Sequence, residues 1–141
     1  MKLSESFEVL RPRDDIVELL CAEETLLGLL PGGDTEVVAR DGDHCTTETR
    51  YRALGHEGVA RFRFSFLMDG SVRFEKVCDG KVWKKLEGLV CVEERTNESC
   101  EVRLELSGRT RSLVPEFTIK VPMEEQIRDM TAALVERLSG R

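Results

Sequence analysis

Apolar positions near the end of the chain recur at intervals of three and four residues. Between Pro122 and Ser139, the apolar face is formed by Ile127, Met130, Leu134 and Leu138. Side chains spaced in this way lie on one side of a helix. Pro122 suits the first turn, where the backbone N–H that proline lacks would have no partner. The pattern therefore predicts a long amphipathic helix of about 27 Å, at about 1.5 Å per residue.

One strand pattern and two shorter helical patterns open the chain. Residues 2–10 alternate between apolar and polar side chains, which is typical of a half-buried strand. Residues 14–21 and 23–30 place leucines at helical spacing, behind acidic residues that favour the positive end of the helix dipole. Pro31-Gly32-Gly33 ends the second helix, because proline cannot continue a helix and glycine permits a turn.

Between Asp34 and Gly108 the period changes to two, which predicts six strands. These strands are expected at residues 34–40, 44–53, 59–68, 72–78, 81–95 and 100–108. The connecting turns are expected at residues 41–43, 55–58, 69–70, 79–80 and 96–99. The alternation is irregular within 81–95, and we expect a bulge or bend at Gly88 to shift its phase.

Residues 109–121 fit two interpretations. The alternation of Phe117, Ile119 and Val121 suits a strand, whereas Pro115-Glu116 suits an early start of the last helix. We favour a helix that begins near Val114 or Pro115, because the preceding strand already ends at Gly108.

One strand, two short helices, six strands and one long helix predict an α+β fold. Because hairpins join consecutive strands, the expected sheet is an antiparallel meander of about seven strands that curves around the last helix. No internal repeat or linker interrupts the chain, so we expect residues 1–141 to form a single domain.

The charge balance excludes some classes of partner. The chain carries 21 Lys+Arg against 27 Asp+Glu, for a formal net charge of −6. Such an acidic chain, with no long basic run, is a poor candidate for nucleic-acid binding. Short basic groups at Arg50/Arg52, Arg61/Arg63 and Lys81/Lys84/Lys85 are interpreted as solvated strand faces.

No apolar run approaches the ~20 residues of a membrane span. The first residues lack the apolar segment of a signal peptide. The five cysteines are irregularly spaced, so we expect a cytoplasmic protein with reduced thiols. The sequence does not indicate an oligomeric state.

Several short stretches resemble a known superfamily. They are Phe7, Asp14–Leu20, Leu29–Gly33, Gly108, and the Gly55-x-x-Gly58 sequence before the strand that carries Phe62, Phe64 and Phe66. With the order of elements, they resemble the helix-grip, START-like fold of the SRPBCC or Bet v 1-like superfamily along essentially the whole chain. The nearest branch is that of the G-type subunits of carbon monoxide dehydrogenase and the polyketide cyclase-like proteins. The sequence departs from it by lacking a Trp near Val17 and by having Arg111–Pro115 in place of a glycine-rich helix entry.

The resemblance implies a cavity between the curved sheet and the long helix, which relatives use for sterols, lipids, quinones or polyketides. The expected ligand-binding residues are Tyr51, Phe62, Phe64, Phe74 and Trp83 on the strands, and Met123, Ile127, Met130 and Leu134 on the helix. The same side chains would equally suit a filled core. Thr47, Thr49 and Tyr51 are polar groups that either orient a ligand or hydrogen-bond to each other or to the backbone.

No catalytic constellation, metal site or cofactor is predicted. His44 and His56 fall at strand ends or turns, and the cysteines have none of the spacings that zinc ligands show. Four charged residues have uncertain strand phase, namely Glu5, Lys76, Lys85 and Glu87. Any one of them that faces the cavity becomes the best functional lead, because a buried charge demands a partner or a ligand.

Three hypotheses for function remain. The first is a non-enzymatic carrier or sensor of a small apolar molecule, which predicts an enclosed apolar cavity. The second is a cyclase- or dehydratase-like enzyme, which predicts an acid–base pair inside the cavity. The third is a protein-interaction module of the co-chaperone kind, which predicts a closed cavity and an exposed apolar patch.

Overall fold

The computed structural model describes residues 1–53, 56–78 and 81–140. The chain begins with β1 (Lys2–Val9) and two short helices, α1 (Arg13–Leu20) and α2 (Glu23–Leu27). The strands that follow are β2 (Asp34–Asp41), β3 (His44–Ala53), β4 (His56–Phe66), β5 (Val72–Lys76), β6 (Trp83–Thr96) and β7 (Ser99–Thr110). A 3-10 turn, η1 (Glu116–Thr118), leads into the long helix α3 (Lys120–Ser139).

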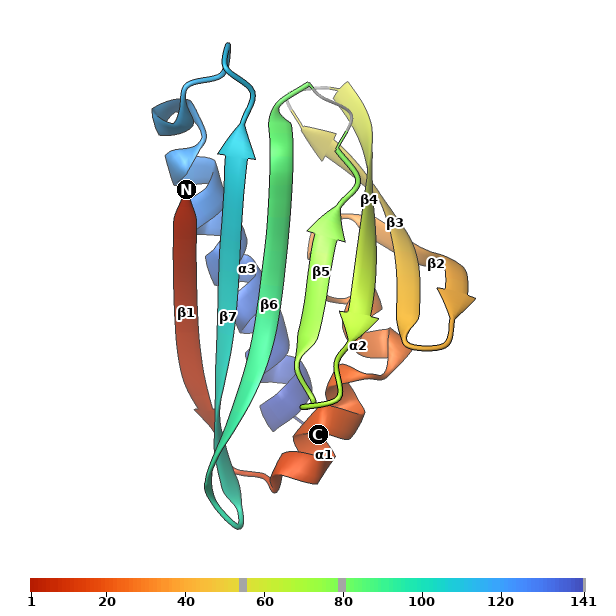
Figure 1. Ribbon diagram of the computed structural model, residues 1–141, viewed down its shortest axis with the longest axis vertical. Coiled ribbons are helices and arrows are strands. Elements are labelled where there is room, and N and C mark those ends of the chain that lie inside the picture. The colour runs from red at the N-terminus through yellow and green to blue at the C-terminus, as the bar shows by residue number, and fades with distance from the viewer. Residues whose placement is uncertain (54–55, 79–80, 141) are drawn as a thin grey trace.

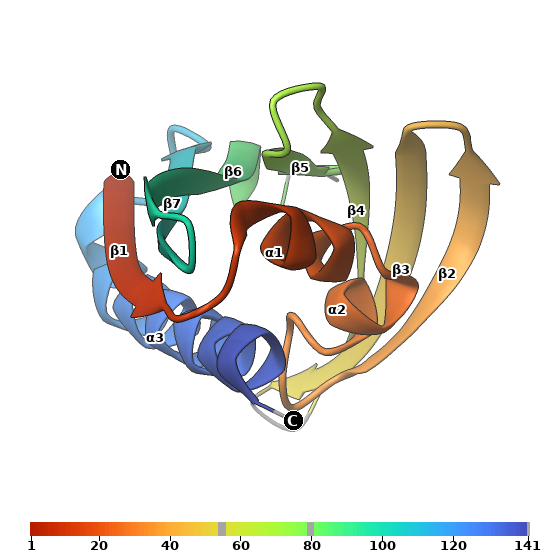
Figure 2. The same ribbon diagram turned by 90° about the horizontal axis from the view of Figure 1, so that it is seen from below.

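The strands form one antiparallel sheet in the order β1-β7-β6-β5-β4-β3-β2 (Figure 1). Strands β2 to β7 form the predicted meander, and β1 joins it at the edge of β7. Figure 2 shows the sheet curved, with α3 on its concave side next to β1 and with α1 and α2 across one end. The predicted α+β helix-grip fold is confirmed.

The core lies where α1 and α2 meet the concave face of the sheet and the C-terminal half of α3. Its helical side chains include Ile16, Leu20, Leu26, Leu134 and Leu138. Its strand side chains include Phe64, Val72, Val90, Val102 and Leu104. All of these are almost fully removed from water, which is the main source of folding free energy.

The bulge that we expected at Gly88 lies elsewhere. Gly88 pairs with both Phe74 and Leu106 without interruption, and the shift in register falls between Trp83 and Lys85. This shift brings Trp83 onto the buried face of β6, together with Val90. Gly88 has a different role, because a Cβ at this position would collide with the ring of Phe74.

The start of the last helix was also predicted wrongly. Strand β7 continues to Thr110, η1 occupies Glu116–Thr118, and α3 begins only at Lys120. Pro122 explains the limit, because a helix that ran back to Pro115 would need the missing N–H of Pro122 to reach the carbonyl of Thr118. The N–H of Thr118 instead closes a tight turn onto Pro115 O at 3.1 Å.

One predicted turn belongs to a strand instead. His56, Glu57 and Gly58 lie in β4, where Glu57 pairs with Arg52 and Gly58 pairs with Tyr51. Gly55 lies outside the described residues, as does the turn predicted at Asp79-Gly80.

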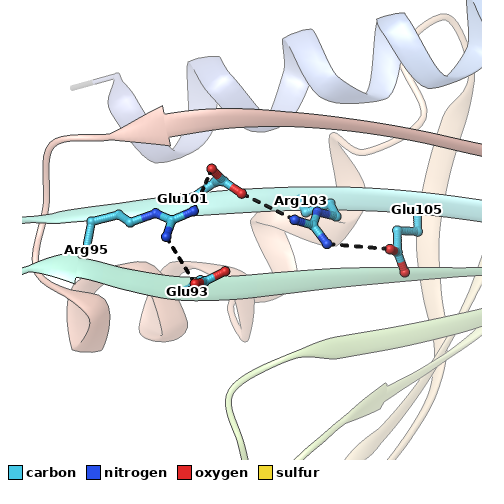
Figure 3. Close-up of polar contacts among 5 residues, drawn as sticks. All are labelled: Glu93, Arg95, Glu101, Arg103 and Glu105. Atoms are coloured by element: carbon cyan, nitrogen blue, oxygen red, sulfur yellow. Dashed lines mark hydrogen bonds and ion pairs between the residues drawn. The ribbon is translucent and has the colours of Figure 1, made fainter.

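The convex face of the sheet carries ion pairs, some within one strand and some between neighbouring strands. Arg95 contacts Glu93 at 3.1 Å and Glu101 at 2.9 Å, and Arg103 contacts Glu101 at 3.4 Å (Figure 3). Arg61 likewise contacts Glu48 at 3.0 Å. These pairs are largely exposed, so each contributes little to stability. Arg61 therefore lies on a solvent-exposed face of its strand, as the sequence predicted.

Candidate ligand-binding cavity

A cavity of about 450 Å³ lies between the concave face of the sheet and the N-terminal half of α3. It occupies the end of the molecule opposite α1 and α2. The loop at Leu30–Gly33 forms one part of its wall, the ends of strands β3 to β7 form another, and Met123, Gln126 and Met130 close it from the helix. The lining residues exposed to solvent are Pro31, Gly32, Tyr51 and Arg52, and we place the mouth of the cavity between them.

The floor of the cavity is aromatic. Phe74 packs edge-on against Phe62, with ring centroids 6.4 Å apart and an interplanar angle of 68°. On the other side it packs against Phe64, with centroids 5.4 Å apart. Phe62 and Phe74 line the cavity, whereas Phe64 lies below them in the core. Phe74 is therefore the side chain that separates the cavity from the solid part of the protein.

The structure brings six of the nine predicted residues together around the cavity. They are Tyr51, Phe62, Phe74, Trp83, Met123 and Met130. The other three, Phe64, Ile127 and Leu134, are 2–3% exposed and belong to the core. Phe64 and Leu134 do not line the cavity because α1 and α2 fill their half of the groove. There both side chains meet Leu20, Leu26 and Leu29.

Several lining residues were not predicted. They are Leu30–Gly33, Arg52, Ala60, Leu86, Leu106 and Gln126. The sequence pattern could have identified Ala60 and Leu106 as inward-facing, because both alternate in phase with the buried residues of their strands. No sequence pattern could place the loop at Leu30–Gly33 beside the cavity, because only the folded chain brings the loop back over it.

Of the polar groups predicted to face inward, Thr49 is held by another side chain. Its hydroxyl shares a hydrogen bond of 2.8 Å with the hydroxyl of Thr35 on β2. Thr47 is buried away from the cavity lining. Tyr51 is 41% exposed, and its ring lies across Gly58, where a Cβ would overlap it.

Of the four charged residues whose strand phase the sequence left uncertain, Lys76 lines the cavity. It follows the buried Val72 and Phe74 on β5 at intervals of two, so it shares their face of the sheet. Lys85 and Glu87 face outward instead, where Lys85 Nζ lies 3.7 Å from Glu87 Oε1 and Arg73 Nη2 lies 2.9 Å from Glu87 Oε2. Glu5 is half-buried on β1 and stands apart from the cavity lining.

Comparison with known proteins rests on structure. No protein-family model matches the sequence, and neither does any curated protein sequence. The Zhui aromatase/cyclase from Streptomyces sp. R1128 matches with a TM-score of 0.79 at 14% identity, over 97% of this chain and 93% of that one. A START superfamily protein from Mycobacterium smegmatis matches with a TM-score of 0.76 at 17% identity, over 97% and 96% of the two chains.

The chain has the START-like, helix-grip fold. Norcoclaurine synthase from Thalictrum flavum shares it, with a TM-score of 0.74 at 17% identity over 99% of this chain and 84% of that one. At these identities the comparisons show the fold alone.

His44 and the five cysteines of this protein lie away from the cavity lining. His44 Nδ1 contacts the hydroxyl of Ser65 at 3.1 Å on exposed strand ends, and the side chain of His56 lies outside the described residues. All five cysteines are free, and burial raises the pKa of the Cys45 and Cys100 thiols. Within the described ranges, no three His, Cys, Asp or Glu residues come close enough to hold a metal ion.

A second hollow of about 510 Å³ lies between α2 and the C-terminal end of α3. Polar contacts tie its walls together, because Arg137 Nε donates to Thr25 Oγ1 at 2.9 Å and Arg11 donates to Gly140 O at 2.8 Å. The Thr25 hydroxyl in turn donates to Leu19 O. These bonds engage Arg11, Thr25 and Arg137, and no aromatic side chain is among the described residues that line the hollow. The aromatic cavity is therefore the stronger candidate for a ligand site.

Proposed function

We propose that this protein binds or carries a small hydrophobic molecule, such as a lipid, a quinone or a polyketide-like compound. The site is the cavity between the sheet and the N-terminal half of α3. The observation that carries the proposal is the combination of an aromatic floor with two methionines opposite it. Flat rings bury large areas, and thioether side chains adapt to the shape of a ligand.

The mechanism of binding is removal of apolar surface from water. A ligand that buries about 300 Å² of apolar surface gains about 7 kcal/mol at about 25 cal/mol per Å². Part of this gain offsets the cost of immobilising the ligand. We place this function in the cytoplasm, in line with the five free cysteines, and assign it to the chain acting as one domain.

The cyclase-like alternative finds less support in the lining. General acid–base catalysis needs two titratable groups that converge on the substrate. Among the described residues that line the cavity there is no histidine, aspartate or glutamate. The titratable groups are Lys76, Tyr51 and Arg52, and Tyr51 stands at the mouth rather than over the floor.

The interaction-module alternative required a closed cavity together with an exposed apolar patch. Leu113, Phe117 and Val121 are exposed around the start of α3. The cavity is nevertheless open to solvent, so the predicted combination is not met. The enclosed cavity expected for the carrier hypothesis is not met either, and that hypothesis rests on the apolar lining instead.

A titration with N-phenyl-1-naphthylamine, an uncharged apolar dye, tests the proposal. We expect saturable binding of one dye per chain, with energy transfer from Trp83, the single tryptophan, which lines the cavity. Ala60 is 8% exposed and lines the cavity, so Ala60→Phe fills the space and lowers dye affinity at least tenfold. Val59, which is 58% exposed, supplies the matched control Val59→Phe, with affinity unchanged.

Unfolding curves of both variants show whether each remains folded. The proposal is wrong if the wild type does not bind the dye, or if a folded Ala60→Phe variant binds it as tightly as the wild type does.

A further inference from the structure

Lys76 places a cation on the wall of an otherwise apolar cavity. It lies at the end of β5, directly across from Phe62 on β4. Its side chain is half-buried and shares the inner face with Phe74. The lysine stem packs well against apolar surface, but the ammonium group loses hydration there unless an acceptor compensates.

The protein supplies no such acceptor among its described residues. Within residues 1–53, 56–78 and 81–140, the Lys76 ammonium group makes no hydrogen bond or ion pair. The two charged residues that line the cavity, Lys76 and Arg52, are both basic, and no described carboxylate lines it. The cavity therefore has a positive electrostatic character within apolar walls.

Two outward-facing cations of the same strands, Arg73 and Arg61, do have carboxylate partners. Arg73, next to Phe74 on β5, has Glu87 at 2.9 Å, and Arg61 on β4 has Glu48 at 3.0 Å. The sheet thus provides carboxylates to these cations on its convex face, yet leaves the inward cation of β5 without one.

We propose that the ligand of this cavity is an apolar acid whose carboxylate accepts hydrogen bonds from Lys76 Nζ. This inference rests on the proposed function and names the class of ligand. A charge-assisted bond of this kind is strong in a partly desolvated site. A neutral molecule of the same shape leaves the ammonium group without an acceptor and binds more weakly.

The position of Lys76 also sets the orientation of the ligand. Phe74, on the floor, lies two residues before Lys76, which is about 6.6 Å along a strand. The carboxylate therefore lies at the Lys76 side of the cavity, and the apolar body extends over Phe62 and Phe74.

Paired titrations with 1-pyrenebutyric acid and its methyl ester test this inference at pH 7, where the acid is ionised. We expect the wild type to bind the acid at least tenfold more tightly than the ester. Lys76→Met, which keeps the length of the side chain, lowers acid affinity about tenfold and leaves the ester unchanged, and Lys76→Arg retains the preference. Lys84→Met removes the same charge from the exposed face of β6 and changes neither affinity.

The outcomes separate this inference from the proposed function. Equal affinity for acid and ester in the wild type, or an equal loss of both in a folded Lys76→Met variant, overturns the acid preference and leaves apolar binding standing. Failure of both pyrene probes and of N-phenyl-1-naphthylamine to bind overturns both proposals.

Discussion

The ring of Phe74 lies against the backbone of Gly88, its register partner on β6, in the space where any other residue would place a Cβ. The absence of a side chain on the glycine leaves room for the far end of the ring at this point. Because Phe74 forms the floor of the cavity, this contact fixes how deep the cavity reaches. A residue without a side chain therefore determines the shape of the candidate binding site.

Gly88→Ala is expected to destabilise the protein by about 1–3 kcal/mol, because the added methyl group displaces a packed ring. Chemical denaturation measures the change in the free energy of unfolding. Gly28→Ala is the control, since the nearest atom to its new methyl group, Glu24 O, is at an ordinary contact distance of 3.7 Å. Phe74→Leu should restore part of the loss in the Gly88→Ala background. Wild-type stability of Gly88→Ala would contradict the packing described.

The two halves of α3 are expected to respond differently to truncation. Leu134 is 2% exposed in the core, so Leu134→Ala costs about 2–5 kcal/mol. Met123 is half-buried and lines the cavity, so Met123→Ala costs less than Leu134→Ala does but weakens binding of N-phenyl-1-naphthylamine severalfold. Urea denaturation and dye titration of both variants provide the comparison. Equal stability losses in the two variants would show that the helix has no distinct cavity-lining half.

The convex face predicts a specific pH dependence. The hydrogen bond from Arg95 holds the pKa of the Glu101 carboxyl below its usual value. A lowered folded-state pKa stabilises the protein above the unfolded pKa of about 4.3, and this contribution is lost as the pH falls through the folded pKa. Glu101→Gln should therefore lower the melting temperature at pH 7, with the difference from wild type vanishing towards pH 3.

The control for this prediction is Glu98→Gln, which removes the same charge from the exposed loop of the same hairpin. Its melting temperature should follow that of the wild type throughout. A Glu101→Gln difference that stays constant from pH 7 to pH 3 would rule out the ionised carboxylate as its cause.

Periodicity was sufficient to predict much of this molecule. The alternation in β4 and β5 and the helical spacing in α3 placed Phe62, Phe74 and Met130 on buried faces, and the structure brings them to one cavity. Periodicity describes one element at a time, however. It cannot tell which half of the groove α1 and α2 will fill, so it did not separate Phe64 and Leu134 in the core from the lining residues.

Which residues of β5 and β6 face inward depends on how the strands pair, and the sequence pattern does not show this pairing. The register shift after Trp83 reverses which residues of β6 face inward, and the alternation alone suggested Gly88 as its place. Lys76 was ambiguous for a related reason, because a lysine at a strand end suits solvent as well as a cavity. Only the continuous pairing of β5 with β4 and β6 fixed its face.

The methionine methyl groups offer the most direct test of the account. The chain has four methionines, of which Met123 and Met130 line the cavity, while Met1 and Met68 do not. NMR spectra of protein labelled with [methyl-¹³C]methionine can follow all four during titration with N-phenyl-1-naphthylamine. The account predicts saturable shifts of the Met123 and Met130 resonances at one dye per chain, with Met1 and Met68 unmoved. Shifts centred on Met68, or none at Met123 and Met130 when the dye binds, would contradict it.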